Sequence, residues 1–163
     1  MKQPIDILKQ MAKDSLRLKN PNVPIYALPK TPKYTQITSN GLTKCVIDFL
    51  SFEGHQAERI STTGRFIDNT KQVVDVLGRS RTIGSKQWIK SNTTNGSSDI
   101  SATIYGRSVK IEVKCAATGD HYQSKDQKAY QRSIEQAGGI YVIARTFDGF
   151  YEWYLQFKRG LDE

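Results

Sequence analysis

The sequence has few cysteines, has no proline beyond Pro32 and lacks any long apolar run. Its two cysteines, Cys45 and Cys115, stand far apart in apolar patterns. This predicts reduced thiols in a core rather than a disulfide framework. No stretch approaches the roughly 18 apolar residues of a membrane span, and residues 1–6 lack the apolar segment of a signal peptide. We therefore expect a cytoplasmic protein without a membrane partner.

Acidic residues are outnumbered by basic ones. The chain of 163 residues holds 24 Lys and Arg against 16 Asp and Glu, which gives a formal charge of +8 and a pI near 9.5. A balance of this kind favours a polyanionic partner, most simply nucleic acid. The length suits one domain with a sizeable core.

The N-terminal segment differs from the rest of the chain because it holds all five prolines. We interpret residues 1–38 as a Pro-rich basic arm that precedes a domain over residues 39–163. Apolar residues at helical spacing predict a short helix within residues 5–18, and residues 21–32 are expected to run extended. Two interpretations stay open: an arm laid on DNA or on a partner subunit, and a partly ordered tail.

The residue patterns of the domain predict an α/β fold, with a mixed central β-sheet flanked by helices. Residues 40–53 predict a helix, with Ser39 or Asn40 as N-cap and Gly54 as its stop. Residues 140–144 are apolar on both faces, which is typical of a central strand covered from both sides. Residues 148–157 predict an aromatic-rich closing helix. We expect the strand over residues 140–144 to lie beside the one that carries Glu112.

Two alternating segments, residues 99–105 and 109–115, predict a β-hairpin. If Gly106 and Arg107 form a two-residue loop, Asp99 lies opposite Lys114, and Ser101 lies opposite Glu112. The polar side chains then share one face. The other face carries the apolar residues Ile100, Ala102, Ile104, Val109, Ile111, Val113 and Cys115.

Asp99, Glu112 and Lys114 would meet at one end of this hairpin. Mg2+ prefers oxygen ligands and usually keeps several waters, so one or two carboxylates with a substrate phosphate suffice to hold it. An ammonium beside the metal can orient water or offset charge on a phosphate. The alternative is a surface hairpin with a simple Asp99–Lys114 cross-strand pair.

At this point the residues resemble a known family. Ser98-Asp99 followed by Glu112-Val113-Lys114 resembles the core motif of the PD-(D/E)XK nuclease superfamily. Residues 96–139 resemble, more narrowly, its VRR-NUC branch of phage-type and junction-cleaving nucleases. The shared features are Gly-x-x-Asp, Ile-Glu-Val-Lys, then Gln-Ser-x-x-Gln at the start of a helix that ends in Ala-Gly-Gly. The resemblance covers about residues 40–155 and implies a restriction-endonuclease-like core.

The resemblance also implies roles for individual residues. Asp99, Glu112 and the Val113 carbonyl would bind Mg2+, for which Mn2+ can substitute, and Lys114 would act in catalysis. Gln127 would support the site, although Ser124-x-x-Gln127 also has the form of a capping box. Relatives carry a glutamate at the start of the first domain helix. Ser39, Asn40 and Gly41 offer none, and Glu53 is a candidate third acid at the far end of that helix.

Basic residues gather where carboxylates are missing. Between Asp75 and Asp99 there is no acidic residue, and we interpret residues 78–98 as a long basic loop. Basic side chains with an aromatic suit contacts to a DNA backbone, whereas Trp88 and Ile89 could instead plug into the core. The candidate DNA-binding residues are Arg59, Arg79, Arg81, Lys86 and Lys90. For Arg59, pairing with a neighbouring carboxylate is the alternative.

With the resemblance, these observations predict a metal-dependent DNA endonuclease, and the resemblance implies selectivity for branched or nicked DNA. The resemblance also implies self-association as a homodimer and a place in the cytoplasm of a bacterium or a phage-infected cell. Two alternatives stay open. One is a DNA-binding module that keeps the fold without cutting, and the other is a sequence-specific, restriction-type nuclease.

Overall fold

The computed structural model describes residues 3–61, 64–89 and 94–161. The chain divides into two units, one formed by residues 1–60 and 96–163 and the other by residues 61–95. Each is described by itself. No helix in the described residues is long and apolar enough to cross a membrane.

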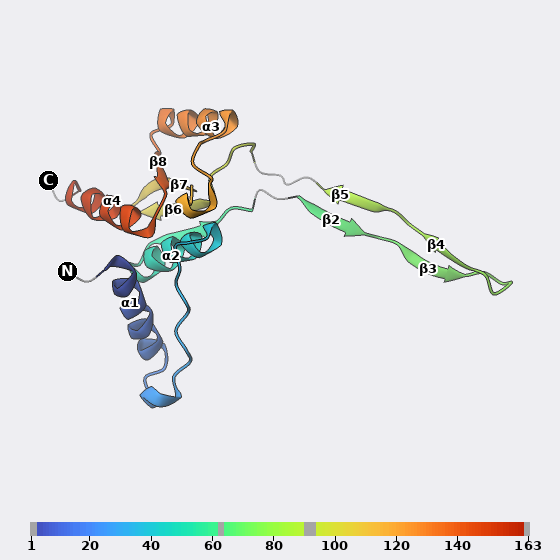
Figure 1. The fold of residues 1–163 in the computed structure, drawn as a ribbon, viewed down its shortest axis with the longest axis horizontal. Coiled ribbons are helices and arrows are strands. Elements are labelled where there is room, and N and C mark those ends of the chain that lie inside the picture. The colour runs from blue at the N-terminus through green and yellow to red at the C-terminus, as the bar shows by residue number, and fades with distance from the viewer. Residues whose placement is uncertain (1–2, 62–63, 90–93, 162–163) are drawn as a thin grey trace. The chain divides into compact units, whose positions relative to one another are not determined.

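A mixed four-stranded sheet forms the centre of the larger unit (Figure 1). Strands β1 (Gln56–Arg59), β6 (Ile100–Ile104) and β7 (Arg107–Val113) are antiparallel neighbours. Strand β8 (Ile140–Ala144) pairs with β7 in parallel, after helix α3 (Lys125–Gln136). The α/β class with a mixed central sheet is therefore confirmed, as is the pairing of residues 140–144 with the strand that carries Glu112.

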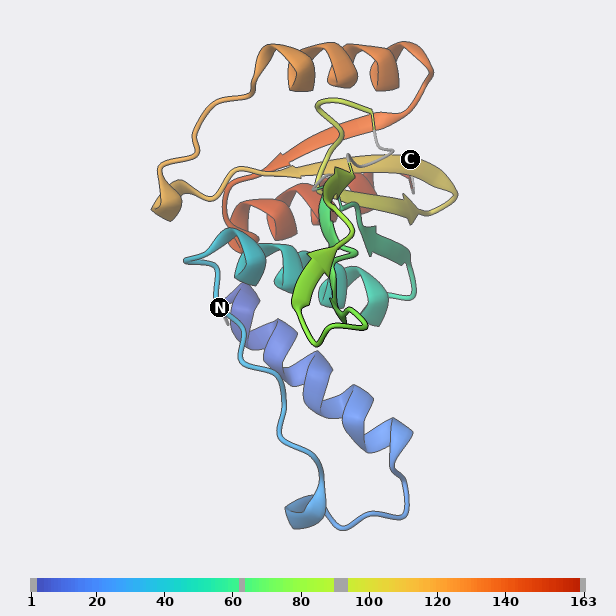
Figure 2. The same ribbon diagram turned by 90° about the vertical axis from the view of Figure 1, so that its right-hand side faces the viewer.

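Helices lie on both faces of this sheet. Figure 2 shows α3 above the strands, with α2 (Ser39–Phe52) and α4 (Phe147–Arg159) below them. The polar face of the hairpin looks toward α3, and the apolar face packs on α2 and α4. All seven residues predicted for the apolar face are buried, and both cysteines are free and buried. Thr38, rather than Ser39 or Asn40, caps α2, because its side chain accepts the Gly41 N–H at 3.1 Å.

The predicted hairpin loop is wrong by one position, and the pairing shifts with it. Tyr105 and Gly106 form the turn, with φ of 49° and 76°, so Ser101 lies opposite Lys110 rather than Glu112. A two-residue turn of this kind needs positive φ at both central residues, which disfavours tyrosine. The Tyr105 hydroxyl lies 3.0 Å from that of Tyr154, a contact that helps to hold this conformation. The register changes by two residues, so every side chain keeps its predicted face.

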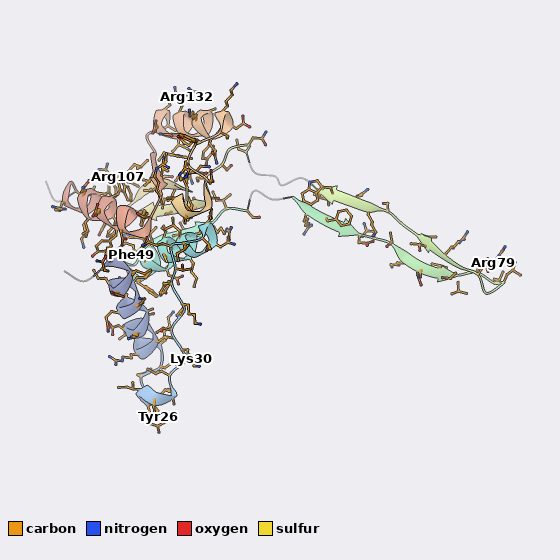
Figure 3. The ribbon with its side chains drawn as sticks, viewed as in Figure 1. Tyr26, Lys30, Phe49, Arg79, Arg107 and Arg132 are labelled. Carbon is orange, nitrogen blue, oxygen red and sulfur yellow. The ribbon has the colours of Figure 1, made fainter. Side chains whose placement is uncertain are left out.

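The N-terminal segment packs on the domain through helix α1 (Pro4–Lys19). Leu8 and Ala12 are buried in the shared core, in keeping with the predicted apolar face. Residues 20–38 follow, with a short 3-10 helix, η1 (Ile25–Ala27), where an extended chain was expected. Tyr26, which belongs to η1, points outward and is exposed (Figure 3). The helix of the arm is thus part of the core.

The smaller unit is a β-ribbon. It contains β2 (Arg65–Asp68) paired with β5 (Lys86–Ile89), and β3 (Lys71–Val74) paired with β4 (Ser80–Ile83). The prediction of a basic loop over residues 78–98 is wrong for β4 and β5, because these segments pair with β3 and β2. Trp88 is 62% exposed, so it does not plug into a core.

Candidate functional site

The polar end of the hairpin brings two carboxylates and an amine together. Asp99 immediately precedes β6, and its Oδ2 accepts the Val113 N–H at 2.9 Å. Glu112 and Lys114 are 2% and 5% exposed at the end of β7, and Lys114 Nζ lies 3.5 Å from Glu112 Oε1. A surface pair between Asp99 and Lys114 is therefore the wrong description, since the lysine is buried and its ion pairs go elsewhere.

Gln127 combines the two roles considered for it. Its Oε1 accepts the Ser124 N–H at 2.8 Å, while Ser124 Oγ accepts the Gln127 N–H at 3.2 Å. This capping box is the one predicted from the sequence. The Nε2 of the same amide donates to Glu112 Oε1. One side chain thus starts α3 and holds the buried carboxylate.

Gly96 is required where the chain passes the first turn of α3. Its φ is +75°, and a Cβ at this position would collide with the Asp126 backbone. A flexible side chain could move aside, but the backbone of a capped helix cannot. Gly96 therefore allows the segment that leads into Asp99 to lie against the turn that carries Gln127.

Two further residues of this site were not predicted. Both carboxylate oxygens of Asp120 accept from Lys114 Nζ, at 3.0 and 3.1 Å. The Tyr141 hydroxyl donates to Glu112 Oε2 at 3.4 Å. For Tyr141 a signal exists: it is the one residue with a polar group among the side chains of β8, beside Lys110 in the parallel register. Asp120 follows a 3-10 turn, and no pattern indicates where its side chain points.

Burial sets the protonation of Glu112. Burial, and after it the nearby negative charge of Asp99, raise the pKa of this carboxyl from 4.5 to about 7, and the Lys114 ammonium opposes both effects. Burial and the charge of Glu112 also raise the pKa of Tyr141 above its ordinary value. Glu112 therefore changes its protonation state close to neutral pH.

Replacing Glu112 by glutamine is expected to flatten the pH dependence of stability. Because the folded pKa lies above the unfolded value of 4.5, the folded state binds more protons, and stability falls as pH rises from about 4.5 to about 7. Urea unfolding at pH 5, 6 and 8 would measure the slope. Glu58→Gln, an exposed position on β1, is the matched control. Equal slopes for wild type and Glu112→Gln would contradict the raised pKa.

Asp99 and Glu112 are the residues that could hold a metal here. Among the described residues, no group of three or more His, Cys, Asp or Glu side chains is arranged for one. Two carboxylates nonetheless fit a hard divalent ion, which keeps water as its remaining ligands. The repulsion between Asp99 and Glu112 is the kind that a cation relieves. The Val113 carbonyl belongs to the same strand end.

Other predicted residues lie away from this cluster. Arg59 Nη2 donates to Asn40 Oδ1 at 2.8 Å, an amide rather than the carboxylate of the alternative interpretation. Arg59 pairs with Ile100 and so belongs to the face opposite Glu112. Glu53 accepts from the Tyr154 hydroxyl at 2.9 Å, and that hydroxyl also contacts Tyr105 at the hairpin turn. Glu53 thus lies at the opposite end of the hairpin from Asp99.

The remaining basic candidates belong to the ribbon. Arg79 pairs with Asp75 at 3.0 Å and Lys86 pairs with Asp68 at 3.3 Å. Arg81 lies opposite Val73 and is exposed. Figure 3 shows Arg79 at the end of the ribbon. Lys90 lies outside the described residues.

Comparison of the chain with models of protein families, with curated proteins and with solved structures finds no match to any of them.

Proposed function

We propose that this protein is a metal-dependent DNA endonuclease of the PD-(D/E)XK type, close to the VRR-NUC branch, and that it hydrolyses phosphodiester bonds in branched or nicked DNA. One observation carries the proposal. Asp99, Glu112 and Lys114 gather at a buried strand end beneath α3, and Gln127 braces the glutamate. A buried charged cluster of this kind costs stability, so a catalytic use explains it better than a structural one.

Each residue has a task in the proposed reaction. Lys114, held 3.0 Å from Asp120, places an ammonium where it can orient the attacking water or stabilise charge developing on the phosphate. Gln127 and Tyr141 fix the two oxygens of Glu112 by donating to them. The Val113 N–H orients Asp99. Mg2+ held by Asp99, Glu112 and the Val113 carbonyl would supply Lewis-acid activation, with Mn2+ as a substitute.

A DNA-binding module that does not cut is the second candidate. The observation that favours it is the start of α2, where Ser39, Asn40 and Gly41 carry no carboxylate. Glu53, the candidate third acid, lies at the opposite end of the hairpin from Asp99. Lys114 is also held by both oxygens of Asp120. Such a module would bind DNA through its basic residues without hydrolysing it.

The full chain is expected to cleave DNA only in the presence of a divalent ion. We would incubate it with supercoiled plasmid, linear duplex and a four-way junction, in Mg2+, Mn2+ or EDTA. The expected result is cleavage in both metals, strongest on the junction, and none in EDTA. Asp99→Asn, purified in parallel, controls for contaminating nucleases. DNA binding without cleavage in either metal would instead support the binding module.

A further inference from the structure

The four strands of the smaller unit make one continuous ribbon. β2–β5 and β3–β4 share the same register, and the Asn69 N–H donates to the Ser85 carbonyl at 3.1 Å between them. Figure 1 shows the strands running on into one another toward a single turn. At about 3.3 Å per residue, the strand from Arg65 to Val74 covers about 30 Å. This is close to one helical turn of DNA, and a DNA groove admits a two-stranded ribbon.

The turn at the end of the ribbon is held from within. Asp75 Oδ1 accepts the N–H groups of Leu77 and Arg79 at 2.8 and 2.9 Å, and Oδ2 accepts from the Arg79 guanidinium at 3.0 Å. The Gly78 N–H donates to the Asp75 carbonyl at 2.9 Å. The backbone of this turn is thus hydrogen-bonded before any partner arrives.

The turn presents two apolar side chains outward. Val76 is fully exposed and Leu77 is 72% exposed. Neither lies in a paired strand, so neither is required for the ladder. Exposed apolar residues on a preformed turn, with arginines beside them, are what architectural proteins insert between base steps.

The positive charge of the ribbon favours an anionic partner. Residues 61–95 hold only two acids, Asp68 and Asp75, and both are paired within the ribbon. Alternation along the strands places Arg65, Lys71 and Arg81 on one face, and in the described residues none of them forms an ion pair. We call these three residues the cationic face. Its charges are spread along the ribbon rather than gathered at the turn, which suits a row of phosphates better than a membrane surface.

We propose that the ribbon lies along duplex DNA through its cationic face and that Val76 and Leu77 insert between base pairs, which kinks the duplex. The inference deepens the proposed function because it rests on DNA as the partner, but it does not require cleavage. The two faces of the ribbon differ in their side chains. The cationic face contacts phosphates, and the opposite face carries the exposed Phe66–Trp88 pair.

The test measures binding, bending and unstacking by the full chain in EDTA, so that cleavage cannot contribute. The probes are a short duplex with dyes at both ends and the same duplex with 2-aminopurine at a central T-A step, which unstacks easily. Wild type is expected to raise energy transfer between the dyes and to raise 2-aminopurine fluorescence. The double variant Val76→Ser, Leu77→Ser is expected to lose both signals and to bind about 10-fold more weakly. Leu77→Phe, which keeps an apolar wedge, should retain them.

Matched variants separate the contributions. Ile25→Ser with Tyr26→Ser removes two exposed apolar residues from η1 and should behave as wild type. Replacing the cationic face by alanine should lower the slope of log affinity against log salt by about 0.9 for each lost contact. The same change at Lys13, Lys19 and Lys158 should leave the slope unchanged.

Several outcomes would overturn the inference. They are no DNA binding by wild type, unchanged bending and fluorescence in Val76→Ser, Leu77→Ser, and binding to anionic phosphatidylserine vesicles through these two residues in place of DNA. Cleavage without bending would refute the insertion of Val76 and Leu77 and leave the endonuclease proposal in place. Bending without cleavage in any metal would refute the endonuclease proposal and leave the insertion in place.

Discussion

Replacement of Lys114 by alanine is expected to slow DNA cleavage about 100- to 1,000-fold with little change in DNA affinity. The amine lies 3.5 Å from Glu112 and 3.0 Å from Asp120, so no other described cation is as well placed beside the buried glutamate. Single-turnover cleavage in Mg2+ would give the rate, and binding in EDTA would give the affinity.

Lys110→Ala is the matched control for this variant. Lys110 lies on the same strand and face, but its Nζ bonds Ser101 Oγ at 2.6 Å, away from Glu112. Its loss should change the rate by no more than about threefold, because its amine bonds Ser101 and not the buried glutamate. If the Lys114→Ala rate recovers fully at pH 9, the lysine serves only to keep Glu112 ionised, and a direct role in the reaction is wrong.

Phe49→Ala is expected to cost about 3 to 5 kcal/mol of unfolding free energy, the largest stability effect that we foresee. Phe49 is 1% exposed, and its ring makes edge contacts that join α2 to α4. Figure 3 shows it between these helices. Its ring partners, at centroid distances from 5.0 to 6.3 Å, are Tyr154, Tyr151, Phe147 and Phe150.

Urea unfolding, followed by far-UV circular dichroism, would measure this loss. Tyr122→Ala removes an aromatic that is mostly exposed in the same unit and should change stability by no more than about 0.5 kcal/mol. A Phe49→Ala loss as small as that of Tyr122→Ala would mean that α4 does not depend on this ring.

Much of the larger unit follows from periodicity alone. Alternation over residues 99–115 predicts the hairpin and its two faces, and helical spacing predicts the helices within residues 5–18 and 40–53. These predictions succeed because burial of one face is a strong constraint that a whole segment must satisfy. The prediction of the hairpin register failed because the register depends on one residue, Tyr105, which has a φ of 49°.

The features that were missed depend on tertiary contacts. Asp120 reaches Lys114 from a loop whose path no local pattern encodes. The sequence predicts a loop over residues 78–98 where the structure has β4 and β5, because both faces of these strands are exposed and their residues show no clean alternation of apolar and polar side chains. Their pairing is set instead by complementary turn residues such as Asp75 and Gly78.

The double use of Gln127 ties local folding to chemistry. The N3 position of a capping box normally accepts either glutamate or glutamine, since both can accept the N–H of the N-cap residue. Here the same amide also grips a carboxylate on a distant strand, so its length and both of its polar atoms are specified at once. A substitution at this position would lose both the cap and the bond to Glu112, so a design that transplants the hairpin must carry the first turn of α3 with it.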